Sequence, residues 1–264
     1  MSKRENTTAY LGRKAIKIWK GAVDFVDFCR SVVLSFRAIR YLKFRAIYNI
    51  IVMQTKFTGI DALPFVVFIA LLIGGTVIIQ ATTNLPKFGV EGFIGNLLVI
   101  IVARELGPLA TALIVVSRSG SAIAAEIATQ KWSREILSLE LMGIDTKLYI
   151  VLPRIVAATI SILSLIIIFD AVAFFGGYLI SLTAVYIPAD IFLQTLIDSF
   201  KIEDLLATII KTIVYGVLIP LICCYYGFKP RSKFDIPIFV SQAVIRTLSI
   251  IFVINAVISV LFYL

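Results

Sequence analysis

The sequence contains no histidine, only three cysteines, and few charged residues, which make up 16% of its 264 positions. It therefore lacks the commonest metal ligand and the commonest general base. Cys29, Cys223 and Cys224 provide neither a disulfide framework nor the spacing of a zinc site. The sequence also has no glycine-rich phosphate loop ending in Lys-Ser or Lys-Thr, so we expect no ATP hydrolysis by this chain. These absences predict a protein that is not an enzyme and binds no metal or cofactor itself.

What the sequence has in abundance is apolar residues, which form 60% of the chain and give a mean hydropathy of +1.00. Soluble domains are about 45–50% apolar and about 25% charged, and disordered chains are less apolar still. A membrane-spanning helix takes about 20 apolar residues. We therefore predict an all-α integral membrane protein, with residues 1–264 forming one membrane domain. No cleavable signal peptide is expected, because the first 40 residues contain no uninterrupted apolar core.

The net charge of +9 is concentrated at the N-terminus. Residues 1–56 hold 12 Lys and Arg against three acids, whereas the rest of the chain holds 13 of each sign. A basic segment beside a membrane domain is typical of contact with the anionic cytoplasmic leaflet. We accordingly expect no nucleic-acid partner.

Residues 11–34 are predicted to form an amphipathic helix that lies in the membrane interface. The apolar residues of this helix recur at helical spacing, and basic and acidic residues occupy the other side. The apolar residues are Ile16, Trp19, Val23, Val26 and Val33. A helix packed on a soluble domain would show the same pattern. A basic elbow with Arg37, Arg40, Lys43 and Arg45 follows within residues 35–60, so that residues 8–45 form the predicted interfacial helix and elbow.

Five membrane spans are predicted from the sequence. They are long apolar stretches over residues 61–87, 92–117, 150–180, 205–228 and 236–264, of which only the first has no charged residue between its ends. Basic residues are concentrated in the loops after the second and fourth spans, whereas the loops after the first and third hold mostly acids. By the positive-inside rule, the N-terminus and the two basic loops are cytoplasmic.

The second span carries two ionisable residues, Arg104 and Glu105, followed by Gly107 and Pro108. Burying such groups in a membrane is costly, so they should face a partner, a polar cavity or a substrate headgroup. The ring of Pro108 clashes with the carbonyl group four residues earlier, which predicts a kink and a free backbone acceptor at Arg104. Two interpretations stay open here: a structural ion pair between packed helices, and a site on a transport pathway.

Two further segments follow the second span. Residues 117–128 are rich in small residues, including Gly120, and predict close helix packing. Residues 133–143 predict a short helix, with Ser133 as its N-cap, Glu135 in its first turn and Gly143 at its end. Such a helix is too short to span a membrane, and its apolar side needs to be covered, either by other loops of this chain or by a separate soluble subunit.

The run from Arg104 to Arg154, RELGPLATALIVVSRSGSAIAAEIATQKWSREILSLELMGIDTKLYIVLPR, resembles the signature region of the MlaE/YrbE family. These proteins are permease subunits of ABC transporters associated with MCE proteins. The similarity extends to Gly74 and Gln80 in the first span and to the segment IFDAVAFFGG, which contains Asp170. Ser117, Ser119, Thr146 and the Arg134-Glu135 pair depart from the family pattern. The residues that match the family motif are Arg104, Glu105, Gly107, Pro108, Arg118, Gly120, Ala125, Glu126, Leu139, Glu140, Met142, Gly143, Asp145, Pro153 and Arg154.

The resemblance implies a homodimeric permease of the bacterial inner membrane that moves phospholipids. Its partners would be an ABC ATPase on the cytoplasmic side, which holds ATP and Mg, and an MCE-domain protein outside. The implied substrate-binding residues are Leu72, Ile73, Val77, Gln80, Arg104 and Glu105. The implied coupling helix lies within residues 131–145, with Ser133, Glu135, Ile136, Leu139, Glu140, Met142, Gly143 and Asp145. Helix packing and the kink are assigned to Gly74, Gly107, Pro108, Gly120, Glu126 and Asp170.

Two other functional classes stay open. One is a channel or secondary transporter that works without an ATPase and uses Arg104, Glu105 and Asp170, although no inverted repeat supports it. The other is a scaffold that anchors extracytoplasmic proteins. Co-purification with an ATPase would separate the permease from both.

Overall fold

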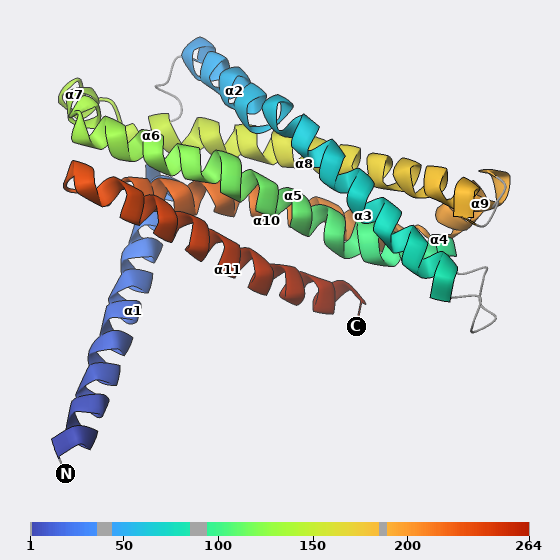
Figure 1. The fold of residues 1–264 in the computed structure, drawn as a ribbon. Helices are drawn as coiled ribbons and strands as arrows, with labels where there is room; N and C mark the ends of the chain where they lie inside the picture. The colour runs from blue at the N-terminus through green and yellow to red at the C-terminus, as the bar shows by residue number, and fades with distance from the viewer. Residues whose placement is uncertain (1, 36–43, 85–93, 185–188, 264) are drawn as a thin grey trace.

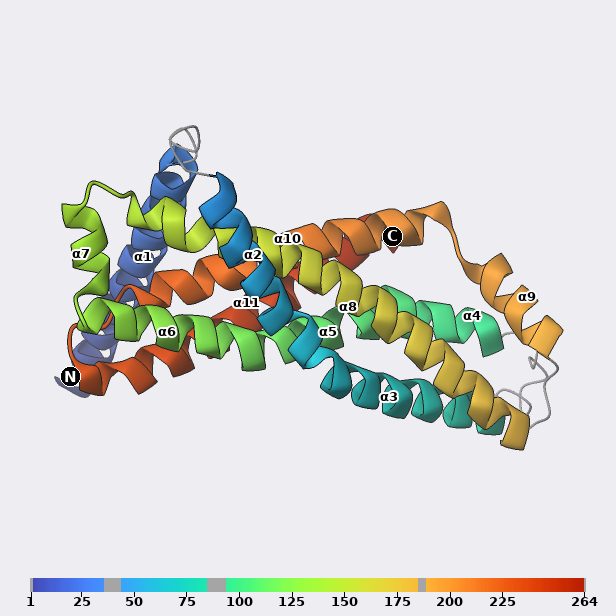
Figure 2. The same ribbon diagram turned by 90° about the horizontal axis from the view of Figure 1, so that it is seen from above.

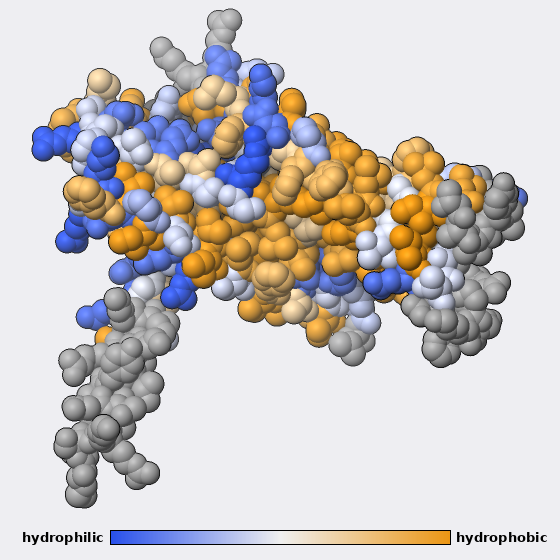
Figure 3. All heavy atoms as spheres, viewed as in Figure 1, coloured by the Kyte–Doolittle hydropathy of each residue, from blue (hydrophilic) through white to orange (hydrophobic). Residues whose placement is uncertain are grey.

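The computed structural model describes residues 2–35, 44–84, 94–184 and 189–263, and all the regular elements within these ranges are helices. Five stretches are long and apolar enough to cross a membrane, as predicted. They run over Ile47–Thr83, Gly95–Trp132, Thr146–Leu182, Ile202–Gly227 and Lys233–Tyr263. Figure 1 shows these helices side by side in an elongated bundle, with α7 at one end and α9 at the other. Figure 3 shows an apolar band over the middle of the bundle and hydrophilic side chains around the α7 end.

The first span is longer than predicted. It begins with α2 (Phe44–Thr58), continues through the short 3₁₀ helix η2 (Ile60–Ala62) and ends with α3 (Leu63–Asn84). Residues 44–58, predicted as part of a basic elbow, are therefore helical. The side chain of Lys56 in this helix is exposed. Arg37, Arg40 and Lys43 of the predicted elbow lie outside the described residues.

The second span is built from five consecutive helical segments and extends past its predicted end at Ser117. Hydroxyl groups that bond back to the preceding turn, as Ser117 does to the Leu113 carbonyl at 2.6 Å, allow this polar stretch to stay helical. The segments are α4 (Ile94–Leu98), the π-helix η5 (Val99–Leu106), α5 (Gly107–Val115), the π-helix η6 (Val116–Gly120) and α6 (Ser121–Trp132).

The remaining helices complete the bundle around α8. This long helix packs against α2, α3, α5 and α10, and contributes the buried residues Ile162, Leu165, Ile166 and Phe169 to the core. Figure 2 shows α2 crossing α8, and α3 running beside α8 toward the α9 end of the bundle. The elements are α7 (Glu135–Leu141), α8 (Thr146–Ala184), α9 (Ala189–Ser199), α10 (Ile202–Gly227), the 3₁₀ helix η7 (Lys233–Asp235) and α11 (Ile236–Tyr263).

The N-terminal helix α1 (Ser2–Ser35) projects away from the bundle at the α7 end (Figure 1). Its last turns are held by aromatic contacts, with Phe25 5.1 Å from Tyr225 between ring centroids, and by a hydrogen bond from Lys147 to Ser31. The predicted apolar residues Ile16, Trp19, Val23, Val26 and Val33 are all exposed. This face is therefore free to contact lipid, and the location of α1 in the membrane interface stays a prediction.

Gly74 allows α3 and α8 to pack closely, and we expect Gly74→Ala to lower the free energy of unfolding by about 1–3 kcal/mol. A Cβ atom at residue 74 would overlap the backbone of Ala173, with its Cα only 2.8 Å away. Gly21→Ala on α1 is the matched control, because a Cβ there meets nothing within 4 Å. Thermal unfolding in detergent micelles measures both variants. Equal melting temperatures would contradict close packing at Gly74.

Candidate functional site

The predicted break in the second span is the π-helical segment η5, which ends at Leu106, two residues before Pro108. The amide of Gly107 bonds to the carbonyl of Val102, five residues earlier, and Pro108 has no N–H to offer the carbonyl of Arg104. That carbonyl accepts a hydrogen bond from the Lys211 ammonium group on α10 at 2.6 Å. The free acceptor was therefore predicted correctly, whereas its partner was not foreseen.

Arg104 is paired with Asp204 at the start of α10. Its Nε lies 2.8 Å from Oδ1, and its Nη2 donates to Oδ2 at 3.2 Å, so one edge of the guanidinium group faces both carboxylate oxygens. Asp204 Oδ2 also accepts the backbone N–H of Lys201 at 2.9 Å. The same buried carboxylate thus completes the N-terminus of α10 and neutralises Arg104. The side chain of Tyr263 covers Arg104, with its ring centroid 4.7 Å from Cζ.

Glu105 joins the second span to α10 and α11. It accepts a hydrogen bond from Asn255 Nδ2 at 2.7 Å and lies 3.4 Å from Lys211 Nζ. The Tyr215 hydroxyl donates to Asn255 Oδ1 at 2.8 Å, and Lys211 also contacts Ser259 at 2.9 Å. We call this network the polar cluster. Its members are Arg104, Glu105, Asp204, Lys211, Tyr215, Asn255 and Ser259.

The polar cluster holds two cations and two anions, so its formal charge is zero. Ionisable groups within a membrane are stable only when they are paired or hydrogen-bonded in this way. Sequence reasoning missed Asp204 and Lys211, because it assigned them to a loop and to the end of a span. The acid in the first turn of α10 and the lone lysine in an apolar run were the available signals.

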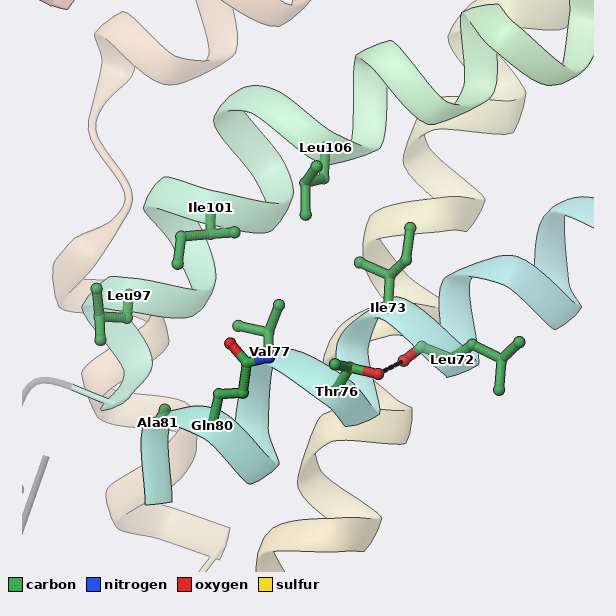
Figure 4. A pocket seen from close by; sticks show the side chains of 9 residues that line it. All are labelled: Leu72, Ile73, Thr76, Val77, Gln80, Ala81, Leu97, Ile101 and Leu106. Atoms are coloured by element: carbon green, nitrogen blue, oxygen red, sulfur yellow. Dashed lines mark hydrogen bonds between the residues drawn. The ribbon is translucent and has the colours of Figure 1, made fainter. Parts of the chain in front are cut away.

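An apolar cavity of about 530 Å³ lies between α3 and the first half of the second span (Figure 4). Four of the predicted substrate residues line it, and Figure 4 shows Val77 and Gln80 projecting from α3 toward Leu97 on α4. The hydroxyl group of Thr76 donates a hydrogen bond to the Leu72 carbonyl at 2.7 Å, so the wall of the cavity stays largely apolar. The lining residues are Leu72, Ile73, Thr76, Val77, Gln80, Ala81, Leu97, Ile101 and Leu106.

The two predicted charged substrate residues do not line that cavity. Arg104 and Glu105 face a separate cavity of about 320 Å³ beside α11, with Ile100 and Tyr263 in its wall. The structure thus divides the predicted substrate residues between two cavities, one apolar and one next to the polar cluster. Both cavities are bordered by the second span.

Asp170 on α8 lies against the break in the second span. A Cβ atom at Gly107 would overlap Asp170 Oδ1, so only glycine allows the carboxyl group to approach here. Asp170 Oδ1 is buried and has no hydrogen-bond partner among the described residues. The predicted packing residues Gly107 and Asp170 therefore meet directly.

Between Pro108 and the α7 end, the second span packs closely against α8 and α10. A Cβ atom at Gly120 would lie 3.0 Å from Cys223 Sγ on α10. Glu126 on α6 lies 2.8 Å from Arg154 Nη2 on α8, and Arg154 also donates to the Ile150 carbonyl at 2.8 Å. These contacts fix α6, and with it the start of α7, against two other spans.

The short helix α7 starts two residues later than predicted. Ser133 is the C-cap of α6, and Arg134, with φ of 63°, turns the chain into α7, so the predicted N-cap is wrong. Gly143 does end the helix region, with φ of 76° and the paired backbone bonds Gly143 to Glu140 and Ile144 to Leu139. Left-handed φ values at both ends make α7 a sharply bounded unit.

The side chains of α7 divide into anchors and an exposed face. Ile136 is buried, Glu140 accepts a hydrogen bond from Thr146 at 3.1 Å, and Asp145 caps α8 through the backbone N–H of Lys147. Leu141 and Met142 are 81% and 73% exposed. Two large apolar side chains thus protrude at the end of the bundle, and none of the residues that the structure describes covers them. Of the other predicted coupling residues, Glu135 is exposed and accepts a hydrogen bond from Ser133, and Leu139 is half-buried.

The sequence of this chain also matches a known protein family. The family model described as "Permease MlaE" matches residues 51–261. These residues include the second, third and fourth spans in full and nearly all of the first and fifth spans. The chain belongs to the MlaE permease family.

Relatives within the MlaE family extend over most of the chain. A probable ABC transporter permease of Rickettsia prowazekii is 30% identical over 90% of this chain and 94% of its own length. The intermembrane phospholipid transport system permease protein MlaE of Haemophilus influenzae is 30% identical over 76% of each chain. The chloroplastic protein trigalactosyldiacylglycerol 1 of Arabidopsis thaliana is 26% identical over 93% of this chain and 69% of its own. The polar cluster, the apolar cavity and α7 all lie within the part that the family model matches.

Proposed function

We propose that this chain is the membrane-spanning permease subunit of an ATP-driven transporter that moves phospholipids between the inner membrane and an extracytoplasmic MCE-protein assembly. The observation that carries the proposal is the apolar cavity between α3, α4 and η5, which lies inside the membrane-spanning part of the bundle. A cavity of this composition accepts acyl chains, because it offers apolar contact and few polar groups to desolvate. The name of the Haemophilus relative supports a phospholipid as the substrate.

The proposed assembly is a homodimer with two ATPase subunits, which bind ATP and Mg²⁺, at the α7 end. That end is cytoplasmic in this proposal, because it carries the basic loops, and the α9 end faces outward. Leu141 and Met142 would enter a groove on the ATPase. Movement of α7 would reach the second span through α6, since Glu126 and Arg154 tie α6 to α8. The break at Pro108 and the two cavities beside it would then change shape.

Filling the apolar cavity should block lipid movement. We therefore expect Val77→Trp to reduce phospholipid transfer at least tenfold. A tenfold reduction corresponds to a loss of about 1.4 kcal/mol in the binding free energy of the lipid. Transfer of fluorescent phospholipid out of proteoliposomes that contain the whole complex measures the effect. Ile167→Trp is the control, because Ile167 faces outward from α8 and is 59% exposed. Unchanged transfer by Val77→Trp, with the protein folded, would contradict a lipid path through this cavity.

A further inference from the structure

A third cavity, of about 490 Å³, lies between α4, α9 and the start of α10. The wall of this cavity is polar, unlike that of the apolar cavity, and it shares Ile100 and Arg104 with the cavity beside the polar cluster. We call it the α9 cavity. Its lining residues are Asn96, Ile100, Arg104, Thr195, Asp198, Ser199 and Lys201.

The charges in the α9 cavity are arranged as a neutral set. Asp204 engages Nε and Nη2 of Arg104, which offsets the charge of Arg104 and leaves Nη1 as a donor that Asp204 does not use. Lys201 and Asp198 add one charge of each sign, and neither has an ion-pair partner among the described residues. A ligand of matching chemistry carries an anion for Arg104 and Lys201 and a cation for Asp198.

The outer edge of the α9 cavity is continuous with an apolar surface. Phe192 and Leu196 pack inward from α9, whereas Leu193 and Ile197, one turn apart, are exposed. Exposed apolar residues then continue along the chain into α10 through Phe200, Ile202, Leu205 and Leu206. A helix with one buried and one exposed apolar edge beside a membrane span is suited to lie at the lipid boundary. The ligand of this cavity would therefore bring its own apolar part.

We propose that the α9 cavity binds the zwitterionic headgroup of a membrane phospholipid, with the phosphate at Arg104 and Lys201 and the ammonium group of a phosphoethanolamine at Asp198. The proposal rests on the proposed function and narrows its substrate. A net-neutral headgroup leaves no charge unpaired in the cavity. An anionic headgroup such as phosphoglycerol would place no cation at Asp198, and its binding would lose that contact.

The test is native mass spectrometry of the purified full-length chain in micelles that contain equal amounts of phosphatidylethanolamine and phosphatidylglycerol. We expect about twofold to fivefold more phosphatidylethanolamine than phosphatidylglycerol to be bound. This is the ratio that the free energy of one exposed ion pair gives. Asp198→Asn should bring this ratio close to one, and Lys201→Gln should reduce the binding of both lipids. Glu203→Gln is the matched control, because it removes an exposed acid two residues beyond Lys201 that does not line the cavity.

Equal binding of the two lipids by the unmodified chain would overturn the proposal, as would an equal effect of Asp198→Asn and Glu203→Gln. Soluble glycerophosphoethanolamine added at the lipid's concentration should not displace the lipid, because it has no acyl chains for the apolar edge. Displacement would overturn the assignment to a membrane lipid. Failure of the proposed function itself is distinguishable, since it would appear as no phospholipid bound at all and no effect of Val77→Trp on transfer.

Discussion

Replacing Lys211 by methionine is expected to lower the free energy of unfolding by about 2–4 kcal/mol and to stop lipid transfer. Lys211 is fully buried and bonds to the Arg104 carbonyl, Ser259 and Glu105. Methionine fills a similar volume but removes the ammonium donor of the Arg104 carbonyl. Residue 108 cannot replace that donor, because proline has no N–H. The pairing with Glu105 adds less, since that side chain is 36% exposed.

Thermal unfolding in micelles and the proteoliposome transfer assay together check this prediction. The control is Lys56→Met, which removes an exposed lysine from the first span and should change stability by less than about 0.5 kcal/mol. Adding Glu105→Gln to Lys211→Met should cost less than the two single changes combined, because the second change removes a carboxylate that the first has left unpaired. Equal losses at Lys211 and Lys56 would show that the polar cluster does not stabilise the bundle.

Local chemistry made parts of the site predictable from the sequence. Pro108 cannot donate to the carbonyl four residues earlier, and in the structure that carbonyl, of Arg104, accepts a hydrogen bond from Lys211 instead. Gly143 predicted the end of a helix, and its positive φ value confirms that end. Five long apolar stretches identified the five spans, because a helix that crosses a bilayer needs about 20 mostly apolar residues.

The partners of the buried charges could not be predicted, because they come from residues far apart in sequence. Asp204 lies 100 residues from Arg104, and Asn255 lies 150 residues from Glu105. A single sequence states which residues need a partner but not which helix will supply it. The same limit applies to the division of the substrate residues between two cavities, since the π-helix η5 changes which side chains share a face. The bounds of two spans also differ from the prediction, because the first span begins earlier, with α2, and the second continues past Ser117.

The double change Leu141→Glu and Met142→Glu is expected to weaken assembly with the ATPase subunit by at least tenfold while leaving the permease folded. Both side chains are more than two-thirds exposed, so their replacement costs this chain little stability. At an interface, large apolar side chains that enter a pocket commonly contribute about 2 kcal/mol or more each. Two carboxylates introduced here would also lose their hydration on entering an apolar pocket, which would weaken binding further.

Co-purification of the two subunits at defined concentrations, with ATP hydrolysis as a second readout, measures this effect. Ile202→Glu is the matched control, because Ile202 is 80% exposed but lies at the opposite end of the bundle, at the start of α10. Assembly that weakens equally in both variants would indicate a general loss of folding rather than a docking face on α7. Undiminished assembly of the α7 variant would place the ATPase elsewhere. In that case the exposed α7 side chains would need another partner, because the bundle itself leaves them uncovered.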